Sequence, residues 1–458
     1  MKRKIAILIL VSSLAGLLGT KAGFSLHQSL VASTFCLSIL GVILFWELRL
    51  SFVFFGAGIV LITHSVDLEN LIKFASLDVI LFLIGMMILV GMMNDVGFFY
   101  WLITRIIRIK NLSGEKLFIL LMSISAILSA LMGEVASIII MAKIIIDISD
   151  LLDVDPKPLI LSSVLATNIG SSGTVLGNPI GILIAARANL TIEDFMRQAL
   201  PITLLVLVLM IALLSLLFKK TIRKLTEKIV PLRDNSFFIT LISIPTDRKT
   251  RISIGIFSLT LLCIILHRRL ELLFALKENT LLMILPIVFA GIAMLYRQDR
   301  VRHYVEREVE WTSILFFLFL FALGGVIKYS GISDIIAKSL VTKFGSPFSL
   351  LSGVMIYSSG ILSSVLDNTV VVASYIPVIQ SMGGMNINLR PLWWAVLFGA
   401  CYGGNITMIG STANIVAMDI LEKRKGIKIS FFEWLKIGLV VGIISLTTAY
   451  IIIFFLWR

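Results

Sequence analysis

The chain has 458 residues, of which 58% are hydrophobic and only 15% are charged, and its mean hydropathy is +1.02. A soluble domain of this size cannot cover so much apolar surface, so the composition excludes a soluble protein and predicts a polytopic membrane protein. The formal net charge of +13 falls mainly in short loops between apolar runs. Basic residues in such loops set membrane topology, so this charge does not indicate nucleic-acid binding.

The sequence of residues 1–77 predicts scaffold helices. Three basic residues precede an apolar run at 5–20, which places the N-terminus in the cytoplasm by the positive-inside rule. No convincing small-residue cleavage site follows this run, so we interpret it as a retained helix; a cleaved signal peptide is the alternative. Further spans are expected near 29–46, 51–65 and 79–94, followed by an amphipathic interfacial helix over 101–110.

Glu134 is the most informative single residue. It follows Gly133 in the middle of a long apolar block, 117–148, where a carboxylate is costly and usually faces a cavity, a partner or an ion pathway. As one helix this block would be about ten residues too long for a bilayer. We therefore predict a re-entrant hairpin with its tip at Gly133–Glu134. A broken helix over 159–186, interrupted at Asn168-Ile-Gly-Ser-Ser-Gly-Thr, completes a first unit over 78–218.

The central segment 219–251 holds nine Lys or Arg against three Asp or Glu, and we interpret it as a cytoplasmic linker loop. If the N-terminus is cytoplasmic, the number of predicted spans places this loop in the cytoplasm only when 117–148 is re-entrant and does not cross the membrane. Scaffold helices are expected over 252–310. A second unit over 311–458 repeats the pattern, with a hairpin at 348–380 and a broken helix at 393–420, and the last helix leaves the C-terminus outside.

The two units align at an offset of 234, which brings Gly133-Glu134-Val135 onto Asp367-Asn368-Thr369. At an offset of 233, Thr174-Val-Leu-Gly falls on Thr407-Met-Ile-Gly. The first hairpin enters from the cytoplasm and the second from outside, so the sequence predicts an inverted repeat. Such repeats bind substrate and coupling ions near the midplane, at broken helices.

These tips and breaks supply the candidate binding residues. Glu134 and Asp367 could each exchange a proton or coordinate a cation. Neutral oxygens and amides suit a hard cation or a hydrogen-bonded anion, and helix N-termini at the breaks can stabilise an anion. The further candidates at the tips and breaks are Gly133, Asn168, Ser171, Ser172, Thr174, Asn368, Thr369, Asn405 and Thr407.

Enzyme motifs are absent: the sequence has no His-Glu-x-x-His, no nucleophile-elbow serine and no phosphate-binding loop. The three cysteines lack metal-ligand spacing. We therefore expect no enzymatic activity, no resident cofactor and no structural metal.

Two motifs resemble the ion transporter superfamily, which includes citrate-transporter-like permeases, arsenite permeases, NhaD-type antiporters and divalent-anion/sodium symporters. They are Ala-Thr-Asn-Ile-Gly-Ser-Ser-Gly-Thr-Val-Leu-Gly-Asn-Pro, ending at Pro179, and Gly-Gly-Asn-Ile-Thr-Met-Ile-Gly-Ser-Thr-Ala-Asn-Ile-Val, ending at Val416. The resemblance implies about eleven transmembrane helices, an elevator movement of the hairpin-bearing domain and a homodimer in the cell membrane. In the dicarboxylate symporters each tip carries Ser-Asn-Thr; here the second tip keeps Asn368-Thr369 and the first keeps none of the three.

Three functions follow. A secondary active permease would move a small anion or oxyanion of the citrate, dicarboxylate or arsenite type, coupled to protons or sodium. A sodium/proton antiporter would use Glu134 and Asp367, with sodium held by Asp367, Asn368, Thr369 and Asn405. A channel or a membrane scaffold without transport activity is the third interpretation.

Overall fold

The computed structural model describes residues 2–21, 23–98, 112–229, 248–345, 347–385 and 387–457, and within these ranges every regular element is helical. The side chains of Lys2 and Trp46 are outside this description. The predicted interfacial helix over 101–110 also lies outside the described residues. The expectation of an all-α membrane protein is confirmed.

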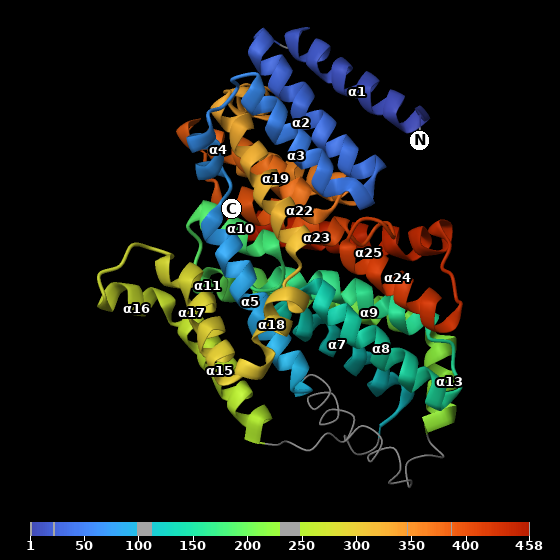
Figure 1. Cartoon of the computed structure of the whole chain (residues 1–458). Coiled ribbons are helices and arrows are strands. Elements are labelled where there is room, and N and C mark those ends of the chain that lie inside the picture. The colour runs from blue at the N-terminus through green and yellow to red at the C-terminus, as the bar shows by residue number, and fades with distance from the viewer. Residues whose placement is uncertain are drawn as a thin grey trace.

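The N-terminal elements are α1 (Lys2–Lys21), α2 (Leu26–Leu44), η1 (Trp46–Leu48), α3 (Arg49–Ile62), α4 (Leu68–Phe74) and α5 (Leu77–Asp95). The helices α1, α2 and α3 pack side by side at one end of the molecule, and α5 runs from that end towards the other (Figure 1). Ser25 and Gln28 form a reciprocal capping box that fixes the start of the second helix. The short fourth helix starts at Asp67, whose carboxylate accepts a hydrogen bond from the Asn70 backbone N–H; this bond lowers the pKa of Asp67.

The first unit contains a helical hairpin followed by a broken helix. The hairpin arms, α7 (Gly114–Met132) and α8 (Glu134–Leu152), meet at Gly133, and both arms pack against α9 (Lys157–Gly170). A 3₁₀ turn, η2 (Ser171–Gly173), and an extended stretch separate α9 from α10 (Pro179–Ala188). Asn178 caps α10, and Pro179 stands at its first position, where a missing N–H is tolerated.

The predicted loop over 219–251 is partly helical. A short helix, α11 (Ile192–Asp194), and a π turn, η3 (Phe195–Ala199), lead into α12 (Leu200–Leu217), which is followed by α13 (Lys219–Ile229). Ile222, Leu225 and Ile229 recur at helical spacing and are buried, while the lysines between them face outward. The prediction of a loop rests only on the number of charges in this segment, which does not reveal the amphipathic pattern. The helix α13 packs on α7, and the Gly114 N–H donates a 3.1 Å hydrogen bond to Thr226 Oγ1.

The middle of the chain forms a second group of long helices beside α5. The basic segment after the second long helix is made of short helical turns. Within it, Arg297 and Arg300 bind the buried carboxylate of Asp95 at 3.0 and 3.1 Å. The elements are α15 (Arg248–Ile265), α16 (His267–Leu273), α17 (Thr280–Tyr296), η5 (Gln298–Arg300), α18 (Val301–His303) and η6 (Tyr304–Glu308).

The second unit repeats the hairpin and the broken helix. Its hairpin arms are α21 (Phe348–Ser363) and α22 (Asn368–Met382), and its broken helix consists of α23 (Arg390–Gly403) and α24 (Thr412–Lys425). The remaining elements are α19 (Trp311–Tyr329), α20 (Ile332–Phe344), η7 (Gly383–Met385) and α25 (Phe431–Leu456).

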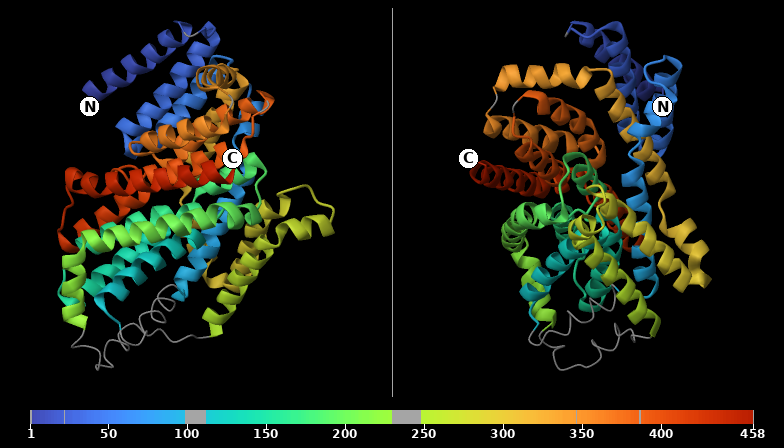
Figure 2. Two further views of the ribbon diagram at one scale, coloured as in Figure 1. Left: turned by 180° about the vertical axis from the view of Figure 1, so that it is seen from behind. Right: turned by 90° about the vertical axis from the view of Figure 1, so that its left-hand side faces the viewer.

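The two hairpin units cross-pack into one body. The returning arm α8 of the first hairpin lies against α24 of the second unit, and α10 of the first unit lies against α22. The left view of Figure 2 shows these teal, green, orange and red helices together below the blue N-terminal group, with the yellow helices α15 and α17 at one flank. In the described part of the chain, seven helices are long and apolar enough to span a membrane, or up to ten when three bent pairs each count as one span.

Candidate functional site

The two hairpin tips differ in length and in how they turn: Gly133 alone joins α7 to α8, whereas residues 364–367 join α21 to α22. Glu134 begins α8 and Asn368 begins α22, each directly after its tip. Gly133 has a φ of +93°, a conformation that glycine adopts without the strain of a side chain. At the matching position Asp367 accepts a hydrogen bond from the Thr369 N–H at 2.9 Å and so caps α22. One tip therefore depends on backbone freedom and the other on a carboxylate cap.

The Glu134 carboxylate is buried and incompletely paired. Only 8% of the residue is exposed, and its Oε1 accepts one long hydrogen bond, 3.4 Å, from Ser411 Oγ. Its Oε2 has no hydrogen-bond partner among the described residues. A buried carboxylate oxygen without a donor is costly. Asp367 lies near enough to interact with it electrostatically, so this oxygen is suited to receive a proton or a cation.

An amide network joins both broken helices next to Glu134. Asn168 Nδ2 donates to Asn405 Oδ1 and to Asn414 Oδ1, both at 2.8 Å. Asn168 Oδ1 accepts from Ser411 Oγ at 3.1 Å. Because Asn168 comes from the first unit and its partners from the second, the network fixes the two breaks against each other at the carboxylate.

Both second half-helices have side-chain caps at matching positions. Asn178 Oδ1 accepts from the Gly181 N–H at 2.8 Å at the start of α10. Ser411 Oγ accepts from the Ala413 N–H at 3.2 Å at the start of α24. Asn178 also donates to Ser171 Oγ at 2.9 Å. The N-terminal turns of α10 and α24 thus lie at the two breaks, where their N–H groups and dipoles favour negative charge.

In each unit, a threonine hydroxyl bond and a close glycine contact hold the broken helix against its own hairpin. Thr174 donates its hydroxyl to the Ala130 carbonyl, and Thr407 donates to the Ser364 carbonyl. The helix before each break also approaches the hairpin closely: a Cβ at Gly170 would lie 2.3 Å from the Ala126 oxygen, and a Cβ at Gly403 would lie 2.2 Å from the Gly360 oxygen. The equivalence of these contacts is the structural counterpart of the sequence repeat.

Apart from Gly133 and the second tip, the predicted residues divide into three groups. Glu134, Asn168 and Asn405 lie together through Ser411, and the Ser171 hydroxyl donates to the Asn168 carbonyl at 2.9 Å. The hydroxyls of Thr174 and Thr407 bind tip carbonyls. The Ser172 hydroxyl lies 2.9 Å from Thr203 Oγ1 and 3.1 Å from the Tyr402 hydroxyl, away from this centre.

The second tip has its own set of partners. Asp367 Oδ2 accepts from Thr412 Oγ1 at 2.9 Å. The amide nitrogen of Asn368 is assigned towards the carbonyl oxygens of Gly410 and Ala400, because it donates to both in that orientation, at 3.0 and 3.1 Å. For Thr369, the contact at this tip is its backbone N–H bond to Asp367.

Sequence reasoning missed Ser411, Thr412 and Asn414. Asn414 Nδ2 donates to the Gly404 and Thr407 carbonyls at 2.8 and 2.9 Å, which holds the second break in shape. A signal was available, because Ser411 matches Asn178 at the offset of 233 and both residues follow a glycine at the end of a break.

The all-helical fold, its apolar helices and the paired breaks define a membrane transporter, and the comparisons identify its family. A family model described as "Citrate transporter" (CitMHS) matches residues 35–399. An uncharacterized transporter of Mycobacterium tuberculosis is 31% identical over 392 residues, covering 83% of this chain and 85% of the relative. The chain therefore belongs to the citrate transporter family.

More distant similarities extend over a similar share of the chain. The human P protein is 24% identical across 85% of this chain, which corresponds to 55% of the P protein. The crystal structure of the Alcanivorax borkumensis YdaH transporter is 16% identical and aligns with a TM-score of 0.55, covering 84% of this chain and 86% of that one. This last likeness concerns the fold alone.

Proposed function

We propose that this chain is a secondary active transporter that moves a small anion or oxyanion, coupled to a proton or a sodium ion bound at Glu134. The single observation that carries the proposal is the unpaired Oε2 of Glu134, buried where the broken helices of both units meet. A coupling ion bound there would neutralise a charge that the surrounding groups leave unbalanced.

The anion would bind beside this carboxylate, at the N-terminal turns of α10 and α24. Ordered N–H groups at helix N-termini bind carboxylate and oxyanion groups. The family name gives citrate as the first substrate to test, with smaller dicarboxylates and arsenite as the alternatives. Charge balance links the two ligands, because protonation of Glu134 or a bound cation lowers the repulsion between the site and an anion.

A sodium/proton antiporter is the second candidate, and one observation favours it. Glu134 and Asp367 interact electrostatically, and the contacts described for their carboxylates come from hydroxyl and backbone N–H groups rather than from Lys or Arg. Two such carboxylates can alternate between protons and a sodium ion without an anion, with Asn368, Thr369 and Asn405 as further sodium ligands.

Proteoliposomes separate these functions. For a permease we expect an inward proton or sodium gradient to drive saturable uptake of labelled citrate, and citrate to drive uptake of the coupling ion. A sodium gradient that moves protons without any anion would establish the antiporter instead. Passive flux that follows voltage without saturation would indicate a channel.

Glu134→Gln tests the role of the carboxylate. We expect this variant to lose coupled transport, at least a hundredfold in initial rate, and to keep the folded state and elution profile of the wild type. Glu115→Gln is the matched control, because Glu115 is an exposed residue at the start of α7. Coupled transport at the wild-type rate in Glu134→Gln would contradict the proposal.

The elevator movement and the homodimer belong to the same proposal. The cross-packing of α8 with α24 and of α10 with α22 supports the elevator, since it makes the two hairpin units one body that can move against the other helices.

A further inference from the structure

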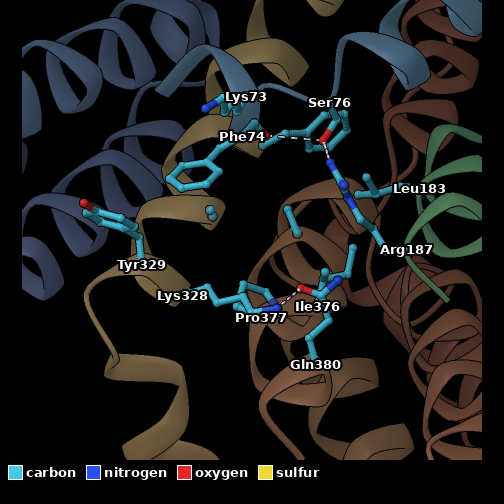
Figure 3. A pocket seen from close by; sticks show the side chains of 14 residues that line it. Lys73, Phe74, Ser76, Leu183, Arg187, Lys328, Tyr329, Ile376, Pro377 and Gln380 are labelled. Atoms are coloured by element: carbon cyan, nitrogen blue, oxygen red, sulfur yellow. Dashed lines mark hydrogen bonds between the residues drawn. The ribbon is translucent and has the colours of Figure 1, made fainter. Parts of the chain in front are cut away.

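A cavity of about 480 Å³ lies away from Glu134, between the N-terminal helices and the hairpin body (Figure 3). Its lining comes from α4 and α19 on one side and from α10 and α22 on the other. This volume falls within the usual range of small-molecule pockets, roughly 300–1,000 Å³.

The cavity is lined by three basic side chains: Lys73, Arg187 and Lys328. Among the fourteen described residues that line it, none is Asp or Glu. Each basic residue stands in the last turn of its helix, where a cation also stabilises the helix dipole. Stabilisation of the helix dipoles would explain a cation at the end of each helix, but it would not explain why the three helix ends face the same cavity. A ligand that binds all three cations would explain it.

Two of these basic side chains bind neutral partners, and the third binds a solvent-exposed carboxylate. Arg187 donates to the Ser76 hydroxyl, and Lys328 donates to Gln380 Oε1 at 3.1 Å. In the view of Figure 3 the Arg187–Ser76 pair lies in the upper part and the Lys328–Gln380 pair in the lower part. Lys73 pairs with Glu69 at 2.6 Å, but their side chains are 62% and 78% exposed, so this pair holds Lys73 only weakly.

Several hydrogen-bond donors therefore remain for a ligand. An arginine side chain carries five N–H donors and a lysine three, and these bonds use one from each residue. Carboxylate and phosphate groups are the ligands that such donors bind best, and Arg can bind them in a bidentate geometry. We propose that this cavity is a second, peripheral site that binds a small multiply charged oxyanion bearing carboxylate or phosphate groups.

The site would concentrate anions beside the hairpin body. A cavity lined by one sign of charge raises the local concentration of opposite charge. Its ligand would contact both the N-terminal helices and the hairpin body, so its affinity would depend on how the two lie against each other. This proposal does not require Glu134 to be the coupling site, and it stands or falls separately from the proposed function.

Cysteine reactivity in the full-length protein tests the charge of the cavity. Tyr329 lines the cavity and is 55% exposed, so Tyr329→Cys gives a reporter in a background of Cys36→Ser and Cys263→Ser. Cys401 is fully buried and is left in place. The probes are anionic methanethiosulfonate ethylsulfonate and its cationic trimethylammonium analogue, applied to protein in phosphatidylcholine nanodiscs.

We expect the ratio of anionic to cationic reaction rates to fall on the order of tenfold in Arg187→Gln/Lys328→Gln. Arg187→Lys keeps the charge and should keep the ratio, which guards against a folding defect. Lys338→Gln removes an exposed charge outside the lining and is the matched control. Glu134→Gln should also leave the ratio unchanged.

Protection identifies the source of the oxyanion. Millimolar citrate that slows modification in the intact cavity but not in Arg187→Gln/Lys328→Gln would identify a free anion. Slower modification in discs containing phosphatidylglycerol, without citrate, would identify a lipid headgroup. The proposal is overturned if the rate ratio is the same with and without Arg187 and Lys328, or if neither citrate nor phosphatidylglycerol protects the cysteine.

Discussion

At the scale of single residues, Asn168 is the hub that connects the two units. Its amide nitrogen satisfies the side-chain oxygens of Asn405 and Asn414, and its oxygen accepts from Ser411. An asparagine suits this position because it can donate and accept at once. The network orients Ser411 towards Glu134 without adding a charge to the centre.

Asn168→Ala and Asn168→Asp test this role. Both variants leave two buried acceptors without their donor, which costs about 2–6 kcal/mol in total at roughly 1–3 kcal/mol for each. Asn168→Asp also adds a carboxylate near Glu134, so we expect the lower melting temperature for Asn168→Asp in purified protein. Asn388→Asp, at an exposed position, is the control and should change little. Equal stability of wild type and Asn168→Asp would show that the network is not coupled to folding.

The carboxylates and amides at tips and breaks could be predicted from the sequence, because polar residues in long apolar runs stand out. Their pairing could not. Nothing in the sequence indicates that Ser172 turns to Tyr402 whereas Asn168 reaches Asn405 across 237 residues, since side-chain direction depends on how the two breaks cross.

At the scale of elements, close backbone contact defines the packing of each broken helix on its hairpin. Gly170 on α9 and Gly403 on α23 both contact hairpin backbone, and a Cβ at either would come within about 2.3 Å of an oxygen. Small residues allow such approach in membrane proteins. The two breaks are thereby held at the same depth relative to their tips.

Gly170→Ala and Gly403→Ala should therefore destabilise the protein despite the higher helix propensity of alanine. We expect a loss of about 1–3 kcal/mol from overpacking, exceeding a gain of about 1 kcal/mol from propensity. Gly291→Ala in α17 is the matched control, because a Cβ there meets no atom within 4 Å. Thermal unfolding of the three variants checks the order. If Gly170→Ala and Gly291→Ala had the same melting temperature, the close approach at Gly170 would not contribute to stability.

Between α5 and the segment after α17, Asp95 forms a buried ionic contact. Arg297 and Asp95 are 8% and 9% exposed, and Tyr304 also donates to Asp95 at 3.1 Å. Asp95→Ala leaves a buried arginine with less compensation, so we expect a loss of about 3–5 kcal/mol. Glu69→Ala, which breaks the exposed pair with Lys73, should cost at most about 1 kcal/mol. Similar melting temperatures for the two variants would contradict this distinction.

Element positions were predictable to different degrees. The span predicted at 79–94 is found at Leu77–Asp95, because its hydropathy changes sharply at both ends. By contrast, α13 was hidden by its lysines, and α20 was not recognised before the second hairpin. Short amphipathic helices are specified by tertiary contact more than by composition.

At the scale of the whole molecule, two sets of polar contacts distinguish movement within the hairpin body from movement against it. Asp150 and Lys425 pair between α8 and α24, inside the body. Lys328 and Gln380 pair between α19 and α22, at the boundary of this body. Although α19 belongs to the second unit in sequence, it also packs against α3 and α4, so we group it with the scaffold helices. An elevator movement must preserve the first pair and break the second.

Disulfide cross-links test this expectation in the Cys36→Ser/Cys263→Ser background. Asp150→Cys/Lys425→Cys should transport after oxidation, whereas oxidised Lys328→Cys/Gln380→Cys should lose transport by at least tenfold and recover on reduction. Lys328→Ser/Gln380→Ser controls for the lost polar contact. Full transport with the second cross-link formed would rule out a displacement at this boundary.

The reach of Asn168 also has a consequence for biosynthesis. Its two amide acceptors lie 237 and 246 residues further along the chain. At roughly 5–20 residues per second, a ribosome needs about 12–50 s to make that intervening stretch. During this time the Asn168 side chain lacks the partners that the second unit supplies, while Thr174 and Asn178 already have partners within the first unit. The nascent first half must therefore be kept hydrated or protected by insertion factors, and it is the stage at which quality-control proteases have most time to act.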